Sequence, residues 1–153
     1  MMIKVLFVCM GNICRSPMAE AIFANLVKQA GLSDQFEIDS AGTIGHHAGN
    51  PAHPGTRQIL KQHQIDYVGR SRQVTVRDLA YFDYVLAMDS DNLYDLQHLA
   101  NTDKVQRLLD FADQVTERNV PDPYYDGNFR HTYGLILAGC QGLLAHIQAE
   151  HKL

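Results

Sequence analysis

The chain has 153 residues, a length typical of one domain, so we expect a single domain over residues 1–153. Thirteen lysines and arginines against seventeen aspartates and glutamates give a formal net charge of −4, which argues against a protein that binds nucleic acid or anionic membranes. Three cysteines are too few, and odd in number, for a disulfide scaffold, so we expect a reducing, cytoplasmic location. The first apolar run is too short for a membrane span and lacks a signal cleavage pattern.

The first half of the chain alternates strand and helix patterns. A nearly continuous apolar run over residues 3–8 is typical of a strand buried on both faces of a parallel sheet. Ser16 and Pro17 then predict a helix start, with Ser16 as N-cap and Pro17 as the first helical residue, and Gly31 predicts its end. Residues 36–41 predict a second strand, and residues 42–55 predict a loop rich in glycine, proline and histidine.

The second half continues the alternation. Residues 54–63 predict a helix, and Thr75 predicts the N-cap of a brief one. Residues 84–88 predict a third strand, followed by a helix to about residue 99 that Asp89 or Ser90 caps.

Residues 105–109 predict another strand, and residues 110–129 predict a turn-rich segment. Apolar residues at helical spacing from Tyr133 to Ile147 predict a last helix, and its three glycines indicate close packing. The whole pattern predicts an α/β fold, a three-layer sandwich in which helices flank a parallel sheet of about four strands.

The segment after the first predicted strand, residues 9–17 (CMGNICRSP), carries the clearest chemical pattern. Ligands of open parallel sheets bind beyond the carboxyl ends of the strands, and the N-terminus of the helix that follows favours an anion. The planar guanidinium of Arg15 can hold two phosphate oxygens, while Gly11 and Asn12 accept the positive φ angles of a tight loop. In this electropositive setting Cys9 is expected to be a reactive thiolate that attacks phosphorus, and Ser16 is a candidate hydrogen-bond donor to its sulfur. The predicted phosphate-binding residues are Met10, Gly11, Asn12, Ile13, Cys14, Arg15 and Ser16.

Residues 5–20 (VLFVCMGNICRSPMAE) resemble the signature of the low-molecular-weight protein tyrosine phosphatases. The resemblance continues through DSAGT at residues 39–43, RQV at 72–74, FDYVLAMD at 82–89 and DPYYDG at 122–127, so it covers essentially the whole chain. Val8 precedes Cys9, whereas the classical and dual-specificity phosphatases have a histidine there. The resemblance implies a phosphatase that acts on phosphotyrosine in a protein or peptide.

The family resemblance also assigns chemical roles. Cys9 would attack phosphotyrosine and form a phosphocysteine, while Asp122 of the DPYY motif protonates the leaving tyrosine and then activates a water. Ser16 would ease departure of the thiolate, and no metal or other cofactor would be needed because the loop and Arg15 neutralise the phosphate. From the residues alone, Asp122-Pro123 is equally well explained as a turn, and Asp126 is a rival acid.

Other residues of the family cleft have counterparts here. The resemblance implies that Tyr124 and Tyr125 line the substrate cleft, although two aromatics packing a loop is the simpler alternative. His46 stands in a variable loop where relatives often carry an aromatic residue, which leaves the substrate preference open. His46, His47 and His53 lack acidic or cysteine companions at ligand spacing, so no metal site is expected.

Asn12, Cys14 and Cys140 are each expected to have a structural or redox role. By resemblance, Asn12 would hold the loop through partners that include Ser40, and Cys14 would guard Cys9 from over-oxidation by a reversible disulfide. The alternative for Cys14 is a small residue that packs the loop. Cys140 falls on the apolar face of the last helix and is expected in the core.

Three rival functions remain at this point. An arsenate reductase of the related type would need a redox cysteine pair after the third strand, and residues 87–92 contain no cysteine. Phosphoarginine phosphatases of similar sequence carry threonine where Ile13 stands, so Ile13 favours phosphotyrosine. A phosphocysteine carrier of similar topology would not need both Arg15 and Asp122. The family also leads us to expect a tyrosine kinase as a partner.

Overall fold

The computed structural model describes residues 2–153 and confirms the predicted α/β class. One sheet of four parallel strands has the order β2-β1-β3-β4. The strands are β1 Ile3–Cys9, β2 Phe36–Gly42, β3 Tyr84–Ala87 and β4 Val105–Arg107. Cys9 pairs with Gly42 and Val8 pairs with Ala87, so three carboxyl ends meet at one edge of the sheet. This is the edge at which parallel sheets bind their ligands.

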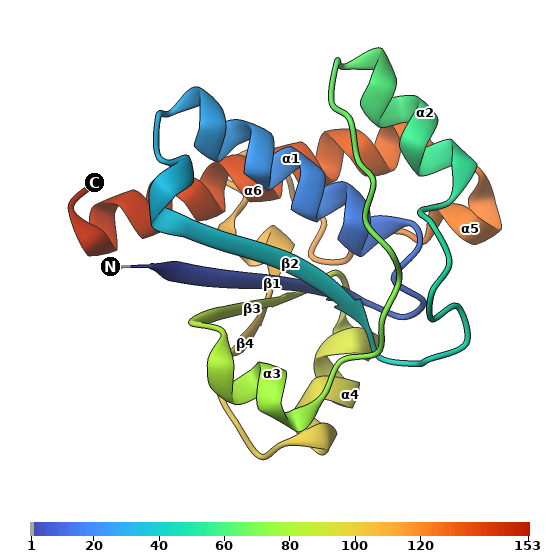
Figure 1. The fold of residues 1–153 in the computed structure, drawn as a ribbon, viewed down its shortest axis with the longest axis horizontal. Helices are drawn as coiled ribbons and strands as arrows, with labels where there is room; N and C mark the ends of the chain where they lie inside the picture. The colour runs from blue at the N-terminus through green and yellow to red at the C-terminus, as the bar shows by residue number, and fades with distance from the viewer. Residues whose placement is uncertain (1) are drawn as a thin grey trace.

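Helices cover both faces of the sheet, which gives the three layers predicted (Figure 1). On one face lie α1 Arg15–Gln29, α2 Pro54–Gln62 and α6 Phe129–His151, and on the other lie α3 Val76–Tyr81 and α4 Ser90–Leu99. The remaining helical turns are η1 Ser33–Gln35, η2 Leu108–Phe111 and α5 Pro123–Asp126. None of the helices within residues 2–153 is both long and apolar enough to cross a membrane.

Strand β1 separates two apolar clusters, which explains its continuous apolar sequence. Successive side chains of a strand point to opposite faces. Val5 and Phe7 therefore join the cluster beneath α1 and α6, whereas Leu6 and Val8 join the cluster beneath α3 and α4. All four of these side chains are fully buried. The burial of β1 on both faces fixes the position of Cys9 at its end.

The glycines of α6 confirm the close packing predicted for two of their three positions. A Cβ on Gly139 would lie 2.7 Å from the Leu108 side chain, and one on Gly142 would lie 1.7 Å from the carbonyl oxygen of Phe111. Gly134 has no neighbour within 4 Å that would exclude a side chain. The two packed glycines let α6 lie directly against η2.

The predicted start of the first helix was wrong by two residues. Helix α1 begins at Arg15, its N-cap is Cys14, and Ser16 lies within the first turn. The hydroxyl of Ser16 does not cap the helix because it contacts Cys9 and Asn12 instead. The caps predicted further along are confirmed, since Thr75 forms a capping box on α3 and Asp89 caps α4.

Two other boundaries differ from the prediction. Strand β4 ends at Arg107 because the apolar residues that follow it turn into η2, where Leu108 packs against α6. The turn-rich segment contains α5, a single helical turn that Asp122 caps and that ends at Gly127 with a φ of 69°. This short helix follows directly on the residue proposed as the acid.

Candidate active site

The loop between β1 and α1 turns its carbonyl groups outward. Its carbonyls accept hydrogen bonds from surrounding segments, whereas none of the amides of residues 10–14 is hydrogen-bonded within residues 2–153. Asn12 adopts a φ of 58°, as predicted for a tight loop. The outward carbonyls leave these amides free for an oxyanion. The donors are the amides of Thr43, Ile44 and His53 and the hydroxyls of Ser71 and Thr56.

Cys9 lies at the floor of this loop and is 3% exposed. Its Sγ lies 3.1 Å from Ser16 Oγ, and the Ser16 amide donates to it over 3.4 Å. The thiol therefore faces the N-terminus of α1, where the helix dipole favours negative charge. The Ser16 hydroxyl and amide are thus placed to donate hydrogen bonds to the Cys9 sulfur.

Arg15 is 3% exposed and is held by partners on two other segments. Its Nη1 donates to Asp89 over 2.6 Å and to the Val120 carbonyl over 2.9 Å, and its Nη2 donates to Asp122 over 3.4 Å. Burial works against the charge, but Cys9 and the two carboxylates outweigh it and raise the pKa of Arg15. The Nε of Arg15 is buried without a partner among the described residues, so it remains available to a phosphate oxygen.

Asp122 reaches the same site from the segment before α5. Its Oδ1 accepts from the Tyr124 amide over 3.0 Å, and its Oδ2 faces Arg15. Pro123 occupies the first position of α5 and fixes the backbone there. The carboxyl group is thus anchored by one oxygen, and its side chain stays 21% exposed at the pocket.

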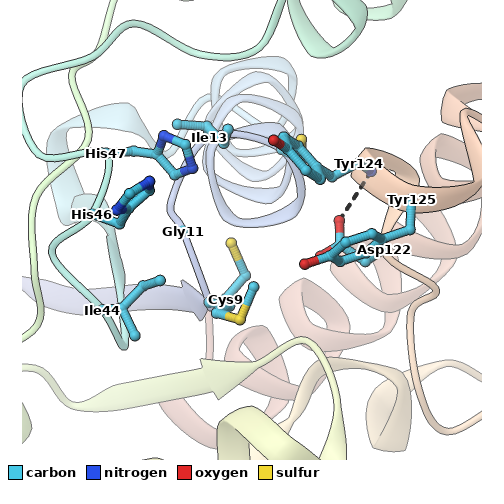
Figure 2. Close-up of a pocket in the computed structure, with 11 residues that line it drawn as sticks. Cys9, Gly11, Ile13, Ile44, His46, His47, Asp122, Tyr124 and Tyr125 are labelled. Carbon is cyan, nitrogen blue, oxygen red and sulfur yellow. Dashed lines mark hydrogen bonds between the residues drawn. The ribbon is translucent and has the colours of Figure 1, made fainter.

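Cys9 and Asp122 line a pocket of about 270 Å³ (Figure 2). Cys9 lies at its base, His46 and His47 line one side, and Asp122 and Tyr124 line the opposite side. The structure thus brings together the residues that the sequence proposed for nucleophile, acid and cleft. The full lining is Cys9, Met10, Gly11, Ile13, Cys14, Ile44, His46, His47, Asp122, Tyr124 and Tyr125.

Asn12 connects the loop to its surroundings in the way the sequence proposed. Its Nδ2 donates to Ser16 over 2.7 Å and to Ser40 over 3.0 Å, and its Oδ1 accepts from the Arg72 amide over 3.0 Å. Asn12, Ser16 and Ser40 are all at most 2% exposed. This buried network holds the positive φ of Asn12.

Cys14 lies in the same loop but in a different environment. Burial, together with the nearby Cys9 and Asp122, raises the pKa of Cys14 to about 12, so it is a neutral thiol near pH 7. Cys9, Cys14 and Cys140 are all free thiols in this structure. Cys140 is fully buried beneath α1, as expected for a core residue.

Several residues of the site escaped the sequence analysis. Asp89 was predicted only as a helix cap, yet it also holds Arg15, and its place at the carboxyl end of β3 is the signal that pointed to it. Ile44 lines the pocket because its amide binds the Met10 carbonyl. No local pattern marks Glu20 or Tyr67, which meet across 47 positions of sequence.

Comparisons with known proteins agree with this geometry. Residues 4–153 match the family model described as low molecular weight phosphotyrosine protein phosphatase. The chain is 51% identical to the low molecular weight protein-tyrosine-phosphatase YfkJ of Bacillus subtilis, over 99% of this chain and 100% of YfkJ. It is 38% identical to PtpA of Staphylococcus aureus, a protein of the same description, over 99% of this chain and 98% of PtpA.

Solved structures show the same likeness. The crystal structure of YfkJ superposes with a TM-score of 0.95, covering 98% of this chain and 97% of that one. A Drosophila protein described as an arginine phosphatase superposes with a TM-score of 0.89 at 37% identity, covering 95% of this chain and 98% of that one. The chain therefore belongs to the low-molecular-weight protein tyrosine phosphatase family.

Proposed function

We propose that this chain hydrolyses phosphotyrosine in proteins or peptides through a phosphocysteine on Cys9. The observation that carries the proposal is that Cys9 and Asp122 line one pocket, that Arg15 is hydrogen-bonded to Asp122 beside it, and that the loop amides have no partner within residues 2–153. Membership of a phosphotyrosine phosphatase family supports the same conclusion. The domain would span residues 1–153.

The first step is transfer of the phosphoryl group to sulfur. The amides of residues 10–14 and the guanidinium of Arg15 bind the phosphate oxygens and neutralise charge in the transition state, which makes a metal ion unnecessary. The Cys9 thiolate attacks phosphorus from below, in line with the tyrosine oxygen. Asp122, whose carboxyl group lies in the same pocket, protonates that oxygen as general acid.

The second step is hydrolysis of the phosphocysteine. Asp122, now ionised, takes a proton from a water that attacks phosphorus. Cys9 leaves as a thiolate, and the Ser16 hydroxyl within 3.1 Å stabilises the charge that returns to sulfur. The same residues thus serve both steps.

The rim of the pocket suits an aromatic ester. His46, Tyr124 and Tyr125 lie around the opening, and the rings of His47 and Tyr124 approach to 6.4 Å between centroids. Such rings can enclose the phenyl group of a substrate. We assign these residues to substrate binding.

Cys14 is assigned a second role as a redox partner of Cys9. Both sulfurs line the same pocket, so a sulfenic acid formed on Cys9 has a thiol within the loop. The raised pKa of Cys14 keeps that thiol neutral near pH 7, so the disulfide should form slowly unless a base removes the proton. Diagonal thiol trapping after peroxide treatment would test this role.

Phosphoarginine is the second candidate substrate, because the Drosophila relative is described as an arginine phosphatase. Ile13, an apolar residue in the pocket, favours the aromatic substrate instead.

A tyrosine kinase that phosphorylates the same proteins is the partner we propose. The three free thiols suit a cytoplasmic location.

The function is tested with the purified full chain. It should hydrolyse p-nitrophenyl phosphate in the presence of EDTA and release a burst of nitrophenolate, and Cys9→Ser should abolish turnover. Asp122→Ala should slow hydrolysis of a phosphotyrosine peptide by roughly 10²–10⁴-fold, the usual contribution of a general acid. Unchanged rates in either variant, or preference for phosphoserine, phosphoarginine or arsenate in a parallel assay, would contradict the proposal.

A further inference from the structure

The segment that carries Asp122 (residues 119–122, the acid segment) lies between two hollows of the surface. Asp122 lines the active-site pocket, and it also lines a second hollow of about 240 Å³ whose lining includes Ser90 and Asn119. Within the acid segment only Val120 is buried. Packing therefore holds one residue of the segment, and the place of the acid depends on the hydrogen bonds around it.

The backbone of Val120 provides the inner attachment of the acid segment. Its amide donates to the Met88 carbonyl over 2.9 Å, and its carbonyl accepts from Arg15 over 2.9 Å. These two bonds fix one residue, but they leave the chain free to turn about that point. A second attachment beside Val120 is needed to fix the direction in which Asp122 points.

Asn119 makes this second attachment, to the first residue of α4. Its Oδ1 accepts from the Ser90 amide over 2.8 Å and from the Ser90 hydroxyl over 3.0 Å. A backbone amide can only donate, so the atom of Asn119 that faces Ser90 is the oxygen, and the hydroxyl donates to it as well. One oxygen thus receives two hydrogen bonds, and it satisfies an amide that has no partner within its own helix.

The same end of α4 also holds Arg15. Asp89, the N-cap of α4, accepts from the Asn92 amide with Oδ1 and from Arg15 with Oδ2. Two consecutive residues, Asp89 and Ser90, therefore bind the guanidinium and the acid segment. The start of α4 thus sets where the acid lies relative to the group that holds the phosphate.

We propose that Asn119 is a positioning residue, which holds the acid segment against the start of α4 so that Asp122 can protonate the leaving oxygen. The inference deepens the phosphatase function proposed above and rests on it. Asn119 bonds to Ser90 and does not line the active-site pocket, so it acts on the reaction through another residue. Its effect on the rate should therefore depend on the presence of Asp122.

The dependence of the rate on the leaving group separates this role from a general loss of structure. Protonation of the leaving oxygen matters most when the phenol released is a weak acid. Phenol is a weaker acid than p-nitrophenol, so hydrolysis of phenyl phosphate depends more on Asp122 than hydrolysis of p-nitrophenyl phosphate does. The quantity compared is kcat/KM, which includes the step in which the phenol leaves.

The test compares two substitutions of Asn119 with a control nearby in the chain. Asn119→Ala removes the acceptor, whereas Asn119→Asp keeps an oxygen that accepts both hydrogen bonds. The control is Thr116→Ala, which removes an exposed hydrogen bond of 3.1 Å to Glu117 and none to α4. Each variant is assayed with both esters, alone and combined with Asp122→Ala.

Asn119→Ala should lower kcat/KM by about ten-fold for phenyl phosphate and by no more than about two-fold for p-nitrophenyl phosphate, since about one hydrogen bond is lost. Asn119→Asp and Thr116→Ala should stay within about two-fold of the wild type with both esters. In the Asp122→Ala background, Asn119→Ala should add less than about two-fold, because the group that it positions is gone.

Four results would overturn the proposal. They are an unchanged rate with phenyl phosphate in Asn119→Ala, an equal loss with both esters, a loss in Asn119→Asp as large as in Asn119→Ala, and a full further loss on top of Asp122→Ala.

A second measurement needs no phosphatase activity. The Tyr124 amide donates to Asp122 Oδ1 over 3.0 Å, so its hydrogen exchange, followed by NMR, reports how firmly the acid is held. In Asn119→Ala this amide should exchange about three- to ten-fold faster, while the Ile65 amide, bonded to the Leu60 carbonyl, keeps its rate. Unchanged exchange at Tyr124 would contradict the proposal. A chain that shows this change but hydrolyses neither ester would reject the proposed function and leave the attachment by Asn119 standing.

Discussion

The base and the rim of the pocket are built in different ways. At the base, Cys9, Asn12 and Arg15 are at most 3% exposed, and each is held by hydrogen bonds to other segments. At the rim, Tyr124 and Tyr125 are 53% and 73% exposed, and their side chains contact neighbouring rings. The side chains at the base are therefore held in one arrangement that suits phosphoryl transfer. The side chains at the rim can be replaced, and the substrate preference altered, with little loss of fold stability.

Among the variants that compare the base with the rim, Arg15→Lys should have the largest effect. A lysine keeps the charge but loses the planar pair of donors and the bonds to Asp89 and Val120. We expect kcat/KM for p-nitrophenyl phosphate to fall on the order of 10²–10³-fold. Arg107→Lys is the control, because that guanidinium contacts Asp110 and Ser90 away from the pocket. A loss below ten-fold would show that charge alone suffices at the base.

Substitution of Asn12 separates its hydrogen bonds from its backbone conformation. Asn12→Gly and Asn12→Ala should both lower kcat by about ten-fold, because both lose the bonds to Ser16 and Ser40. Both variants should also unfold more easily, because both leave buried partners without their hydrogen bonds, and Asn12→Ala should be about 1–2 kcal/mol less stable than Asn12→Gly, since the φ at this position is 58°. Urea unfolding measures the second effect.

Gln64 offers a matched control for Asn12, because it is exposed and has a φ of 62°. Gln64→Ala and Gln64→Gly should differ in unfolding free energy while kcat stays the same. If kcat depends on the residue at Gln64, or if Asn12→Gly retains full activity, the base is not held by the Asn12 side chain.

At the rim, His46→Ala should change selectivity and not chemistry. The His46 ring lies 4.9 Å from that of His47 and lines the pocket. We expect kcat for p-nitrophenyl phosphate to stay within about two-fold and KM for a phosphotyrosine peptide to rise about three- to ten-fold, as one ring contact is worth. His98→Ala, on α4, is the control. A fall in kcat as large as that of Arg15→Lys would abolish the distinction between base and rim.

The smallest effect concerns Asp78, which supports the base through Arg72. Burial alone would raise the pKa of Asp78, but the hydrogen bonds from Arg72 and Thr75 lower it overall. A lowered carboxyl pKa stabilises the fold above the usual carboxyl range, and this stability is lost as the pH falls through the lowered value.

Asp78→Asn should therefore cost about 1 kcal/mol or less at pH 7, and the difference from the wild type should shrink below about pH 4. Urea unfolding at several pH values measures it. A difference that is constant with pH would show that the charge of Asp78 adds nothing, and Asp91→Asn controls for a general effect of charge.

The sequence predicted the parts of the site that are local. One short segment holds the apolar run of β1, the loop from Cys9 to Arg15 and the helix after it. The residue types that phosphate binding requires can therefore be recognised in that segment from the sequence. The pattern misplaced the start of α1 because the Ser16 hydroxyl serves a tertiary contact, which a capping preference does not consider.

The contacts that hold the base are distant in sequence and escaped prediction for that reason. Arg15 meets Asp89 across 74 positions, and Tyr67 meets Glu20 across 47. Neither an aspartate that caps a helix nor a tyrosine in a loop is unusual in itself. Only the fold decides that these side chains share a partner.

Because of the direction of β1, the first and last described residues lie away from the pocket. Cys9 ends the strand, whereas Ile3 begins it, and about 20 Å separates them at the usual rise per residue. The end of α6 lies on the same side as Ile3, because His151 contacts Tyr84 at the start of β3 (Figure 1). A fluorescent label, an affinity tag or a surface linker joined at either end would therefore leave the pocket open to a large protein substrate, which makes the chain suited to immobilised substrate-trapping experiments.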